Sequence, residues 1–373
     1  MTPKERLLRA LNLEKPDRLP ATVHQWQQFH LDTYMGGISP LEAFKLTGLD
    51  AQIQYYADMG LSWTTDAKQN ALQTGEWRED IKVIKNDPDD RILHHTITTP
   101  EGTLTYKTGG DRKTTWMNEY IIKKHEDIEL LRKYMPIPKL DKVGIEKEYD
   151  AVGDAGILRG FVWGDQAGCW QHACCLYPAE DLIVEAMDNP DWVHALMKLL
   201  LDKKMRFIEE SLDGARFDLI ETGGGAASDT LVSPKLHAEF CLPYDRQMHA
   251  ALGAAGQRST YHICGGMMFI LDLLLQNGAD ASETLAPPGV GGNVIDPAEV
   301  RAAFAGRRAM IGGMDQFNVL TTGTPAQIRA ETRRLFEGFG RDGGYICAAS
   351  DHFFETPVEH LKAFAEAARE CVY

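Results

Sequence analysis

Short apolar runs rich in β-branched residues alternate along this chain with longer segments of helical periodicity. We predict eight strands, at residues 18–23, 61–64, 158–163, 217–221, 259–263, 281–285, 309–312 and 345–348. Strands that alternate with helices form a parallel sheet covered by helices. About eight of them favour a closed barrel over an open sheet. The sequence therefore predicts an α/β protein, a single (β/α)₈ TIM barrel domain over residues 1–373.

The segments between these runs predict helices, and their first residues support the assignment. The predicted helices cover residues 190–212, 233–255, 267–277, 297–304, 325–339 and 357–371. Pro297, Pro325 and Pro357 each stand where a first helical turn would begin. A doubly wound sheet would need a phosphate-binding glycine loop after an early strand. The glycine-rich stretches at 223–225 and 289–292 do not match GxGxxG, so the barrel is preferred.

Residues 77–123 interrupt the alternation of strands and helices. They follow a period of two and are punctuated by turn sequences, among them Pro100-Glu101-Gly102 and Gly109-Gly110. We predict an antiparallel β meander inserted into the barrel. One interpretation is a surface ornament; the other is a lid or substrate wall, as large loops at one end of a barrel often are.

The balance of charges restricts the partners of this chain. Its 373 residues include 39 basic and 54 acidic ones, a net charge of -15, which argues against nucleic acid and anionic membranes. No apolar run approaches the roughly 18 residues of a membrane span, and the first residues resemble a charged helix rather than a signal peptide. The seven cysteines are odd in number and scattered, so we expect no disulfide framework and a cytoplasmic location.

Two metal-binding side chains stand two residues apart in "YHICGG", residues 261–266. Side chains at i and i+2 of a strand share a face, so His262 and Cys264 should project to the same side where this strand ends. Cys347 stands at the end of the last predicted strand. Barrel closure would gather these three residues, and a His/Cys/Cys set suits zinc with an open fourth position. The alternative interpretation is a buried histidine and buried cysteines in the core.

We interpret the remaining cysteines as packing residues of helices. Cys169, Cys174 and Cys175 lie in "CWQHACC" with a spacing that fits no usual zinc pattern, so a helix with core cysteines is preferred. Cys241 and Cys371 fall within helical patterns.

Further polar and aromatic residues are expected near the strand ends. Glu221 ends the fourth predicted strand and could ligate the metal or act as a base, a role for which Glu283, Asp351 and His352 compete. Five other residues could wall a flat aromatic substrate: His24, Trp26, Trp163, Tyr261 and Phe353. For both groups the alternative is ordinary packing or loop structure.

The order of HxC, a long gap and then Cys in "GGYIC" resembles the uroporphyrinogen decarboxylase superfamily, in its zinc-dependent, corrinoid-linked methyltransferase branch. Other stretches share the resemblance, namely "ERLLRALNLEKPDRLP", "GGMDQFNVLTTGTPAQIRAE" and "ETPVEHLKAFAEAARE". The resemblance implies a (β/α)₈ barrel, and it implies that the HxC pair and the later cysteine are zinc ligands. The inserted segment, with "TPEGTL" and "EYIIK", is more similar to the methyltransferase components of O-demethylases than to coenzyme M methyltransferases.

One departure from the superfamily restricts the substrate. Uroporphyrinogen decarboxylases carry an arginine-bearing segment after the first strand that holds propionates, whereas "HQWQQFH" here has no arginine. No DxHxxG corrinoid motif occurs in the chain, so a corrinoid is expected on a partner protein. We predict methyl transfer from a methoxylated, preferably aromatic, substrate to that corrinoid, with zinc stabilising the charge of the leaving oxygen.

Several alternatives to this function stay open. They are decarboxylation of a small porphyrin-like or aromatic acid, methyl transfer to a coenzyme M-like thiol, and a binding or scaffold barrel with a structural metal. The expected partners are the corrinoid protein and a small methyl donor, and a homodimer is compatible with the sequence.

Overall fold

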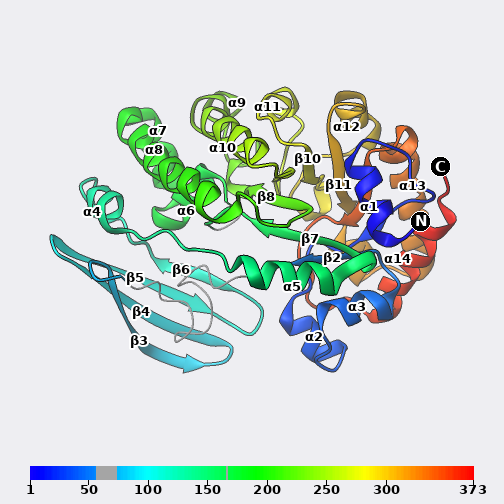
Figure 1. The fold of residues 1–373 in the computed structure, drawn as a ribbon, viewed down its shortest axis with the longest axis horizontal. Coiled ribbons are helices and arrows are strands. Elements are labelled where there is room, and N and C mark those ends of the chain that lie inside the picture. Colours follow the sequence, from blue (N-terminus) through cyan, green and yellow to red (C-terminus); the bar gives the residue numbers. More distant parts are fainter. Residues whose placement is uncertain (56–73, 165–166) are drawn as a thin grey trace.

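Eight parallel strands form the central sheet of this chain, for which a computed structural model describes residues 1–55, 74–164 and 167–373. The strand order is β1-β12-β11-β10-β9-β8-β7-β2. The strands are β1 (Ala21–Thr22), β2 (Ala51–Gln54), β7 (Gly156–Phe161), β8 (Leu219–Gly223), β9 (Ser259–His262), β10 (Ala281–Thr284), β11 (Ala309–Met314) and β12 (Tyr345–Ala349). Figure 1 shows helices on the outside of these strands. The predicted TIM-barrel fold is confirmed.

The second barrel strand differs from the sequence prediction. The predicted strand at residues 61–64 lies outside the described residues, and β2 instead comes directly after Asp50. Its sequence, Ala-Gln-Ile-Gln, carries two glutamines, so it does not read as an apolar strand. The first strand is also shorter than predicted, with only Ala21 and Thr22 in the ladder.

Side chains close the seam between β1 and β2. The backbone N–H of Asp50 donates to the carbonyl of Ala21 at 2.8 Å. Beyond that bond, the Gln52 amide donates to the carbonyls of Val23 and His24 at 3.4 and 3.2 Å, and the Gln54 amide donates to His24 at 2.9 Å. The two glutamines, which make β2 look polar in the sequence, therefore complete the barrel.

The helices follow the predicted alternation. They are α1 (Pro3–Leu11), α2 (Gln28–Tyr34), α3 (Pro40–Thr47), α4 (Asp127–Tyr134), α5 (Lys142–Val152), α6 (Cys169–Leu176), α7 (Ala179–Asp188), α8 (Pro190–Phe207), α9 (Pro234–Leu236), α10 (Leu242–Ala254), α11 (Leu271–Gln276), α12 (Pro297–Phe304), α13 (Pro325–Phe339) and α14 (Val358–Glu370). Both α12 and α13 have the predicted bounds, and Thr324 caps α13 in a capping box with Gln327. Pro357 precedes the first turn of α14 as its N-cap.

Two of the predicted helices contain wider turns. The segment predicted at 190–212 is α8 followed by a π-helical turn, η2 (Ile208–Leu212). The segment predicted at 233–255 is α9, the π-helical turn η4 (His237–Cys241) and α10. The segment predicted at 267–277 is helical only over α11.

Helix α1 closes the amino-terminal end of the barrel. Its Leu7, Ala10 and Leu11 are at most 3% exposed and form one cluster with interior strand residues. The strand members of this cluster are Ile157, Leu219, Ala281, Ala309, Ile311, Ile346 and Ala348. An apolar plug therefore fills this end of the barrel, and chemistry is left to the carboxyl ends of the strands.

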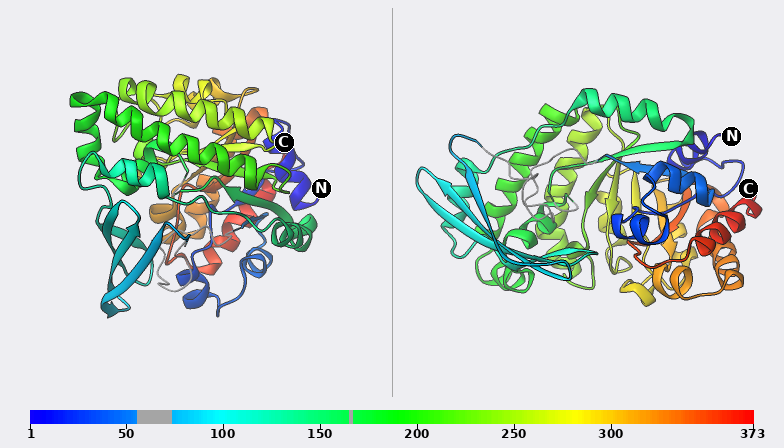
Figure 2. Two further views of the ribbon diagram at one scale, coloured as in Figure 1. Left: turned by 60° about the vertical axis from the view of Figure 1, so that its left-hand side comes forward. Right: turned by 90° about the horizontal axis from the view of Figure 1, so that it is seen from below.

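The predicted meander is an antiparallel four-stranded sheet in the order β3-β4-β5-β6. Its strands are β3 (Arg78–Asp87), β4 (Asp90–Thr99), β5 (Gly102–Gly110) and β6 (Thr115–Glu119). Alternate residues on one face, among them Leu93, Ile97, Leu104 and Tyr106, are buried. That face shares a core with residues of α6, α7 and α8. The views of Figure 2 show this sheet as a separate layer beside the barrel.

The tip of the β5–β6 hairpin reaches the carboxyl end of the barrel. Lys113, in this tip, forms an ion pair with Glu355, which follows β12, at 2.5 Å. The same ammonium group lies 5.3 Å from the ring centre of Phe29, which follows β1. The inserted sheet therefore contacts the barrel at the end where the predicted metal ligands lie.

Among the described residues, no helix has both the length and the apolar character needed to cross a lipid bilayer. The seven cysteines all lie in the described part of the chain, and no two of them form a disulfide.

Candidate active site

Four charged or titratable side chains occupy the barrel interior above the apolar plug. Arg159 lies on β7, Glu221 on β8, His262 on β9 and Glu283 on β10, and none is more than 1% exposed. Each of the first two stands two residues after a plug residue of its strand, as does Glu283 after Ala281. Because side chains of a strand alternate between faces, these residues point into the barrel as their plug neighbours do.

The charges in this layer are paired. Arg159 Nη2 donates to Glu221 Oε2 at 2.8 Å and to both carboxylate oxygens of Glu283 at 2.8 and 2.9 Å. Nε2 of His24, which follows β1, lies 3.3 Å from Glu221 Oε2 and 3.6 Å from Glu283 Oε1. Nδ1 of His262 lies 3.0 Å from Glu283 Oε1. Burying a charge is tolerated when it is paired and hydrogen bonded in this way.

The pairing sets the protonation of the layer. Burial alone would raise the pKa of Glu283, but the Arg159 charge and the hydrogen bonds from His24 and His262 hold that pKa well below its usual value. Burial alone would lower the pKa of His262, but the Cys264 sulfur and the Glu283 carboxylate raise it well above its usual value. The pKa of His24 is likewise raised, because Glu221 outweighs the effect of burial. The layer therefore attracts positive charge.

Among the described residues, three groups of side chains could hold a metal ion. In each group, one ligand atom of every member lies within 4.8 Å of those of the other members. The groups are His262, Cys264 and Asp351; His24, Asp351 and His352; and His24, Glu221, His262 and Glu283. Two of the three predicted ligands, His262 and Cys264, thus lie together, with Asp351 as their companion.

The structure does not bring Cys347 to this cluster. Its strand neighbours Ile346 and Ala348 belong to the interior plug, so Cys347 points outward like Tyr345. There it lies in the same core cluster as Tyr345, and burial raises the pKa of its thiol. This corrects the predicted ligand set, because a residue within the last strand was chosen without regard to the face on which it lies. Asp351, four positions later and beyond the strand, reaches the cluster instead.

The two predicted catalytic residues both lie in or beside the charged layer. Glu221 accepts hydrogen bonds from Arg159 and His24, as described above. His352 stacks on His24, with ring centres 5.2 Å apart, and its Nε2 lies 3.1 Å from Gln25 Oε1. Burial lowers the pKa of His352 to about 4. His352 is therefore neutral near pH 7.

Of the predicted substrate-walling residues, His24 alone belongs to the metal-ligand groups found among the described residues. Tyr261 points outward and donates its hydroxyl hydrogen to Asp245 Oδ2 on α10 at 2.8 Å. Trp26 and Phe353 pack edge to face at 5.7 Å within the main core. Trp163 packs edge to face on His172 at 5.1 Å. These four aromatic residues are at most 8% exposed, so they form packed walls rather than an open surface.

Sequence reasoning missed Arg159 and Gln25. Arg159 had a recognisable signal, since it stands within an apolar run predicted to be a buried strand. A buried arginine requires carboxylate partners, which would have pointed to the two glutamates on β8 and β10. Gln25 had no such signal, because an amide in a loop is common.

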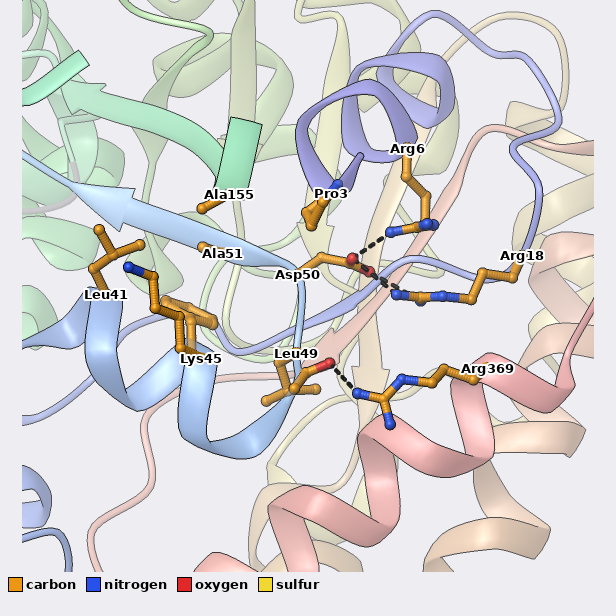
Figure 3. Close-up of a pocket in the computed structure, with 12 residues that line it drawn as sticks. Pro3, Arg6, Arg18, Leu41, Lys45, Leu49, Asp50, Ala51, Ala155 and Arg369 are labelled. Carbon is orange, nitrogen blue, oxygen red and sulfur yellow. Dashed lines mark hydrogen bonds and ion pairs between the residues drawn. The ribbon is translucent and has the colours of Figure 1, made fainter. Parts of the chain in front are cut away.

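A pocket of about 340 Å³ lies at the opposite end of the barrel (Figure 3). There Asp50 accepts hydrogen bonds from Arg6 at 2.6 Å and from Arg18 at 3.0 Å, and Arg369 donates to the carbonyl of Gly48 at 2.8 Å. These residues precede β1 or β2 or lie on α1 and α14, beside the apolar plug. Because catalytic groups of TIM barrels lie at the carboxyl ends of the strands, we regard this pocket as part of the structural closure of the barrel.

Comparison with known proteins places the chain in a family. The family model described as uroporphyrinogen decarboxylase (URO-D) matches residues 104–371, more than half of the chain. A methylated-thiol–coenzyme M methyltransferase of Methanosarcina mazei is 25% identical over 145 residues, which are 39% of this chain and 36% of that relative. The methylcobamide:CoM methyltransferase MtbA of the same organism is 21% identical over 100% of this chain and 99% of its own length.

A solved structure has the same fold. It is a methyltransferase from Methanosarcina mazei with 17% sequence identity and a TM-score of 0.66, and the match covers 99% of each chain. The resemblance stated from the sequence is thus confirmed, and both curated relatives are methyltransferases rather than decarboxylases. The chain belongs to the uroporphyrinogen decarboxylase family.

Proposed function

We propose that this protein is a zinc-dependent methyltransferase that passes a methyl group to a corrinoid carried by another protein. The observation that carries the proposal is the grouping of His262, Cys264 and Asp351 at the carboxyl end of the barrel, with Glu283 hydrogen bonded to His262. The names of the relatives support the reaction class, since one acts on a methylcobamide and both on coenzyme M.

The residues present fit a zinc ion. A nitrogen, a sulfur and an oxygen donor converge, and three protein ligands leave the open position that catalytic zinc sites keep. Glu283 is hydrogen bonded to Nδ1 of His262, so Nε2 is the nitrogen that would bind a metal together with Cys264, and such carboxylate–histidine pairs are usual behind zinc ligands. Zinc at this place would supply a Lewis acid for the atom that loses or gains the methyl group.

The chain's own side chains would orient the metal ligands and balance the charges around them. Glu283 fixes the ring plane and tautomer of His262, and Arg159 in turn fixes both carboxylates. Glu221 lies beside His24 and is a candidate to accept a proton. His352, neutral near pH 7 and stacked on His24, is the second candidate to accept a proton.

The methyl donor we propose is a methoxylated aromatic compound. Support for a flat substrate comes from the sequence positions of Trp26 and Phe353, which follow His24 and His352 and pack on each other as a buried wall. A second candidate is a thiol such as coenzyme M, which the names of the relatives favour. Uroporphyrinogen is disfavoured because Arg159, the interior arginine, is already paired with two glutamates and cannot serve as a clamp for propionates.

The inserted sheet is proposed to shape access to the site. Its contact with Glu355 through Lys113 supports a position over the carboxyl end of the barrel. The corrinoid protein would dock on the same side. We further propose a cytoplasmic location, which the absence of disulfides among the seven cysteines supports. A homodimer is compatible with this arrangement.

An anaerobic assay tests the proposal. The zinc-loaded protein is incubated with a reduced corrinoid protein and, separately, with methoxyaromatic compounds and methylated thiols, and methyl-cobalamin formation is followed by absorbance. We expect methylation from the aromatic ethers and a loss of several orders of magnitude in the His262→Ala variant. The variant His360→Ala serves as a control, since His360 lies on α14, outside the three metal-ligand groups, with its Nδ1 bonded to the carbonyl of Leu320. Methylation from thiols alone would favour the second candidate, and unchanged rates in zinc-free protein would refute both.

A further inference from the structure

A second group of metal-ligand side chains lies beside the proposed zinc ligands. It consists of His24, which follows β1, and of Asp351 and His352, which follow β12. One ligand atom of each lies within 4.8 Å of the others. The two imidazole rings are stacked, with centres 5.2 Å apart and planes inclined by 28°. The function proposed above uses Asp351 alone from this group as a ligand.

His24 presents an uncommitted nitrogen to its surroundings. Its Nε2 lies 3.3 Å from a carboxylate oxygen of Glu221, which can only accept, so this nitrogen carries the hydrogen. Its Nδ1 is buried and has no hydrogen-bond partner among the described residues. A buried imidazole nitrogen without a partner is costly unless something binds it. The hydrogen bond to Glu221 is also the arrangement that fixes a histidine as a metal ligand.

His352 has the same arrangement. Its Nε2 lies 3.1 Å from the amide oxygen of Gln25, so this nitrogen carries the hydrogen. Its Nδ1 then bears a lone pair and lies 3.8 Å from Oδ1 of Asp351. Two acceptors that face each other at this separation, with no hydrogen between them, suit a cation placed between them. Gln25 thus orients His352, and Glu221 orients His24, as Glu283 orients His262.

We propose that His24, Asp351 and His352 form a second site for a divalent first-row transition metal, with Asp351 shared between the two metals. Two imidazoles and one carboxylate suit Zn²⁺, Fe²⁺ or Mn²⁺. The first site contains a thiolate, whereas this one offers only nitrogen and oxygen and is the harder of the two. The inference rests on the proposed function in one respect, since both sites use Asp351.

The formal charges of the cluster indicate what a second metal would change. Glu221, Glu283, Asp351 and a Cys264 thiolate carry four negative charges, and Arg159 carries one positive charge. One divalent ion leaves this cluster with one net negative charge, which repels an anionic oxygen. Two divalent ions leave one net positive charge, which attracts it. A second metal therefore favours substrates that bind or depart through oxygen, such as a phenolate.

Metal stoichiometry tests the inference without any assay of activity. Full-length protein is stripped with a chelator, titrated anaerobically with Zn²⁺ and, separately, with Fe²⁺, and analysed by elemental analysis after gel filtration. We expect two equivalents in the wild type and one in His352→Ala. The matched control His360→Ala should retain two, because His360 lies outside the cluster. His352→Gln is the second variant, in case the alanine variant does not fold.

Cobalt substitution distinguishes the two sites. A thiolate-to-cobalt charge-transfer band reports a metal on Cys264, and cobalt bound without that band reports the His24 site. In His352→Ala we expect one equivalent with the band, and in Cys264→Ser one equivalent without it. One equivalent with the band in both the wild type and His352→Ala would overturn the second site and leave the proposed function standing. Cobalt bound without the band in the wild type would instead contradict the zinc site of the proposed function.

Discussion

Nδ1 of His262 lies 3.0 Å from Oε1 of Glu283, and the register of β9 and β10 places the two residues directly opposite each other. The barrel therefore builds this pair from its backbone, without any flexible loop. A metal ligand and the group that orients it are held by the same pair of neighbouring strands, which is the kind of rigid support that a precise site needs.

Replacing Glu283 with glutamine should weaken zinc binding without abolishing it. The amide keeps the size of the side chain but loses the charge that fixes the His262 tautomer. We expect the zinc affinity to fall by about 10- to 100-fold, as is usual when a carboxylate behind a zinc-bound histidine is lost. Competition with a chromophoric chelator measures the change. Glu359→Gln, on the exposed side of α14, is the control, and equal affinities in the two variants would refute the orienting role of Glu283.

Substitution of Asp351 and substitution of Cys347 should have opposite effects on the zinc content of the protein. The Asp351→Ala variant loses a ligand of the proposed site, so its zinc content should fall, as it should in Cys264→Ser. The Cys347→Ser variant should keep its zinc, because that thiol points toward Tyr345 on the outside of the barrel. Elemental analysis of the purified variants decides the matter. Loss of zinc from folded Cys347→Ser would show that the sequence-based ligand set was right after all.

Arg159→Met should destabilise the protein strongly at neutral pH. The substitution leaves the carboxylates of Glu221 and Glu283 buried without their cation. Breaking a buried pair in this way costs about 3–5 kcal/mol, which urea unfolding at pH 7 measures.

The cost of this substitution should depend on pH. In the wild type the pKa of Glu283 is lowered, so its contribution to stability is present above the unfolded pKa of about 4.3 and is lost as the pH falls through the folded value. The difference between variant and wild type should therefore shrink in acid. A difference that stays constant from pH 7 down to pH 2 would contradict the ion-pair explanation.

Asp245→Asn should stabilise the protein at alkaline pH. Burial raises the pKa of Asp245 to about 7, so the folded state holds this proton longer than the unfolded chain does. The stability of the wild type is then fully present below the unfolded pKa of about 4 and declines as the pH rises toward 7. At about 1.4 kcal/mol per pKa unit, the asparagine variant should be the more stable above pH 7 by up to about 4 kcal/mol. Melting temperatures at pH 5 and pH 8 test this. A wild type that is the more stable at pH 8 would refute it.

The periodicity of the sequence predicted the elements well where their packing is one-sided. Helices α12 and α13 have the predicted bounds because each begins with proline after a capping residue and buries one stripe. Strand β2 was not predicted because its two glutamines make it look polar, although their amides are used in hydrogen bonds across the seam. Local pattern cannot reveal a side chain whose partner lies about 30 residues away in the sequence.

The candidate site could be predicted in part. His262 and Cys264 share a face at two-residue spacing, and the structure brings both to the metal-ligand groups. The prediction of Cys347 as a ligand was wrong about the face on which this residue lies. The inward face of a strand follows from which residues form the interior plug, and identifying those residues requires the register of the whole barrel. Asp351 lies on the loop beyond β12, and the position of a loop residue is set by tertiary contacts that the sequence pattern does not contain.

The glutamine-held seam between β1 and β2 has a dynamic consequence. A side-chain amide can release a carbonyl and rebind it without breaking a backbone ladder, so we expect the barrel to open here at a lower cost than along its paired strands. Amide hydrogens on β1 and β2 should exchange with solvent faster than those on β11 and β12, which share a five-residue register. Because His24 follows β1 and accepts both glutamine amides at its carbonyl, each opening also displaces one wall of the charged layer. The rate at which the seam opens and closes would then limit how fast the ring of His24 can reorient when a ligand binds beside it.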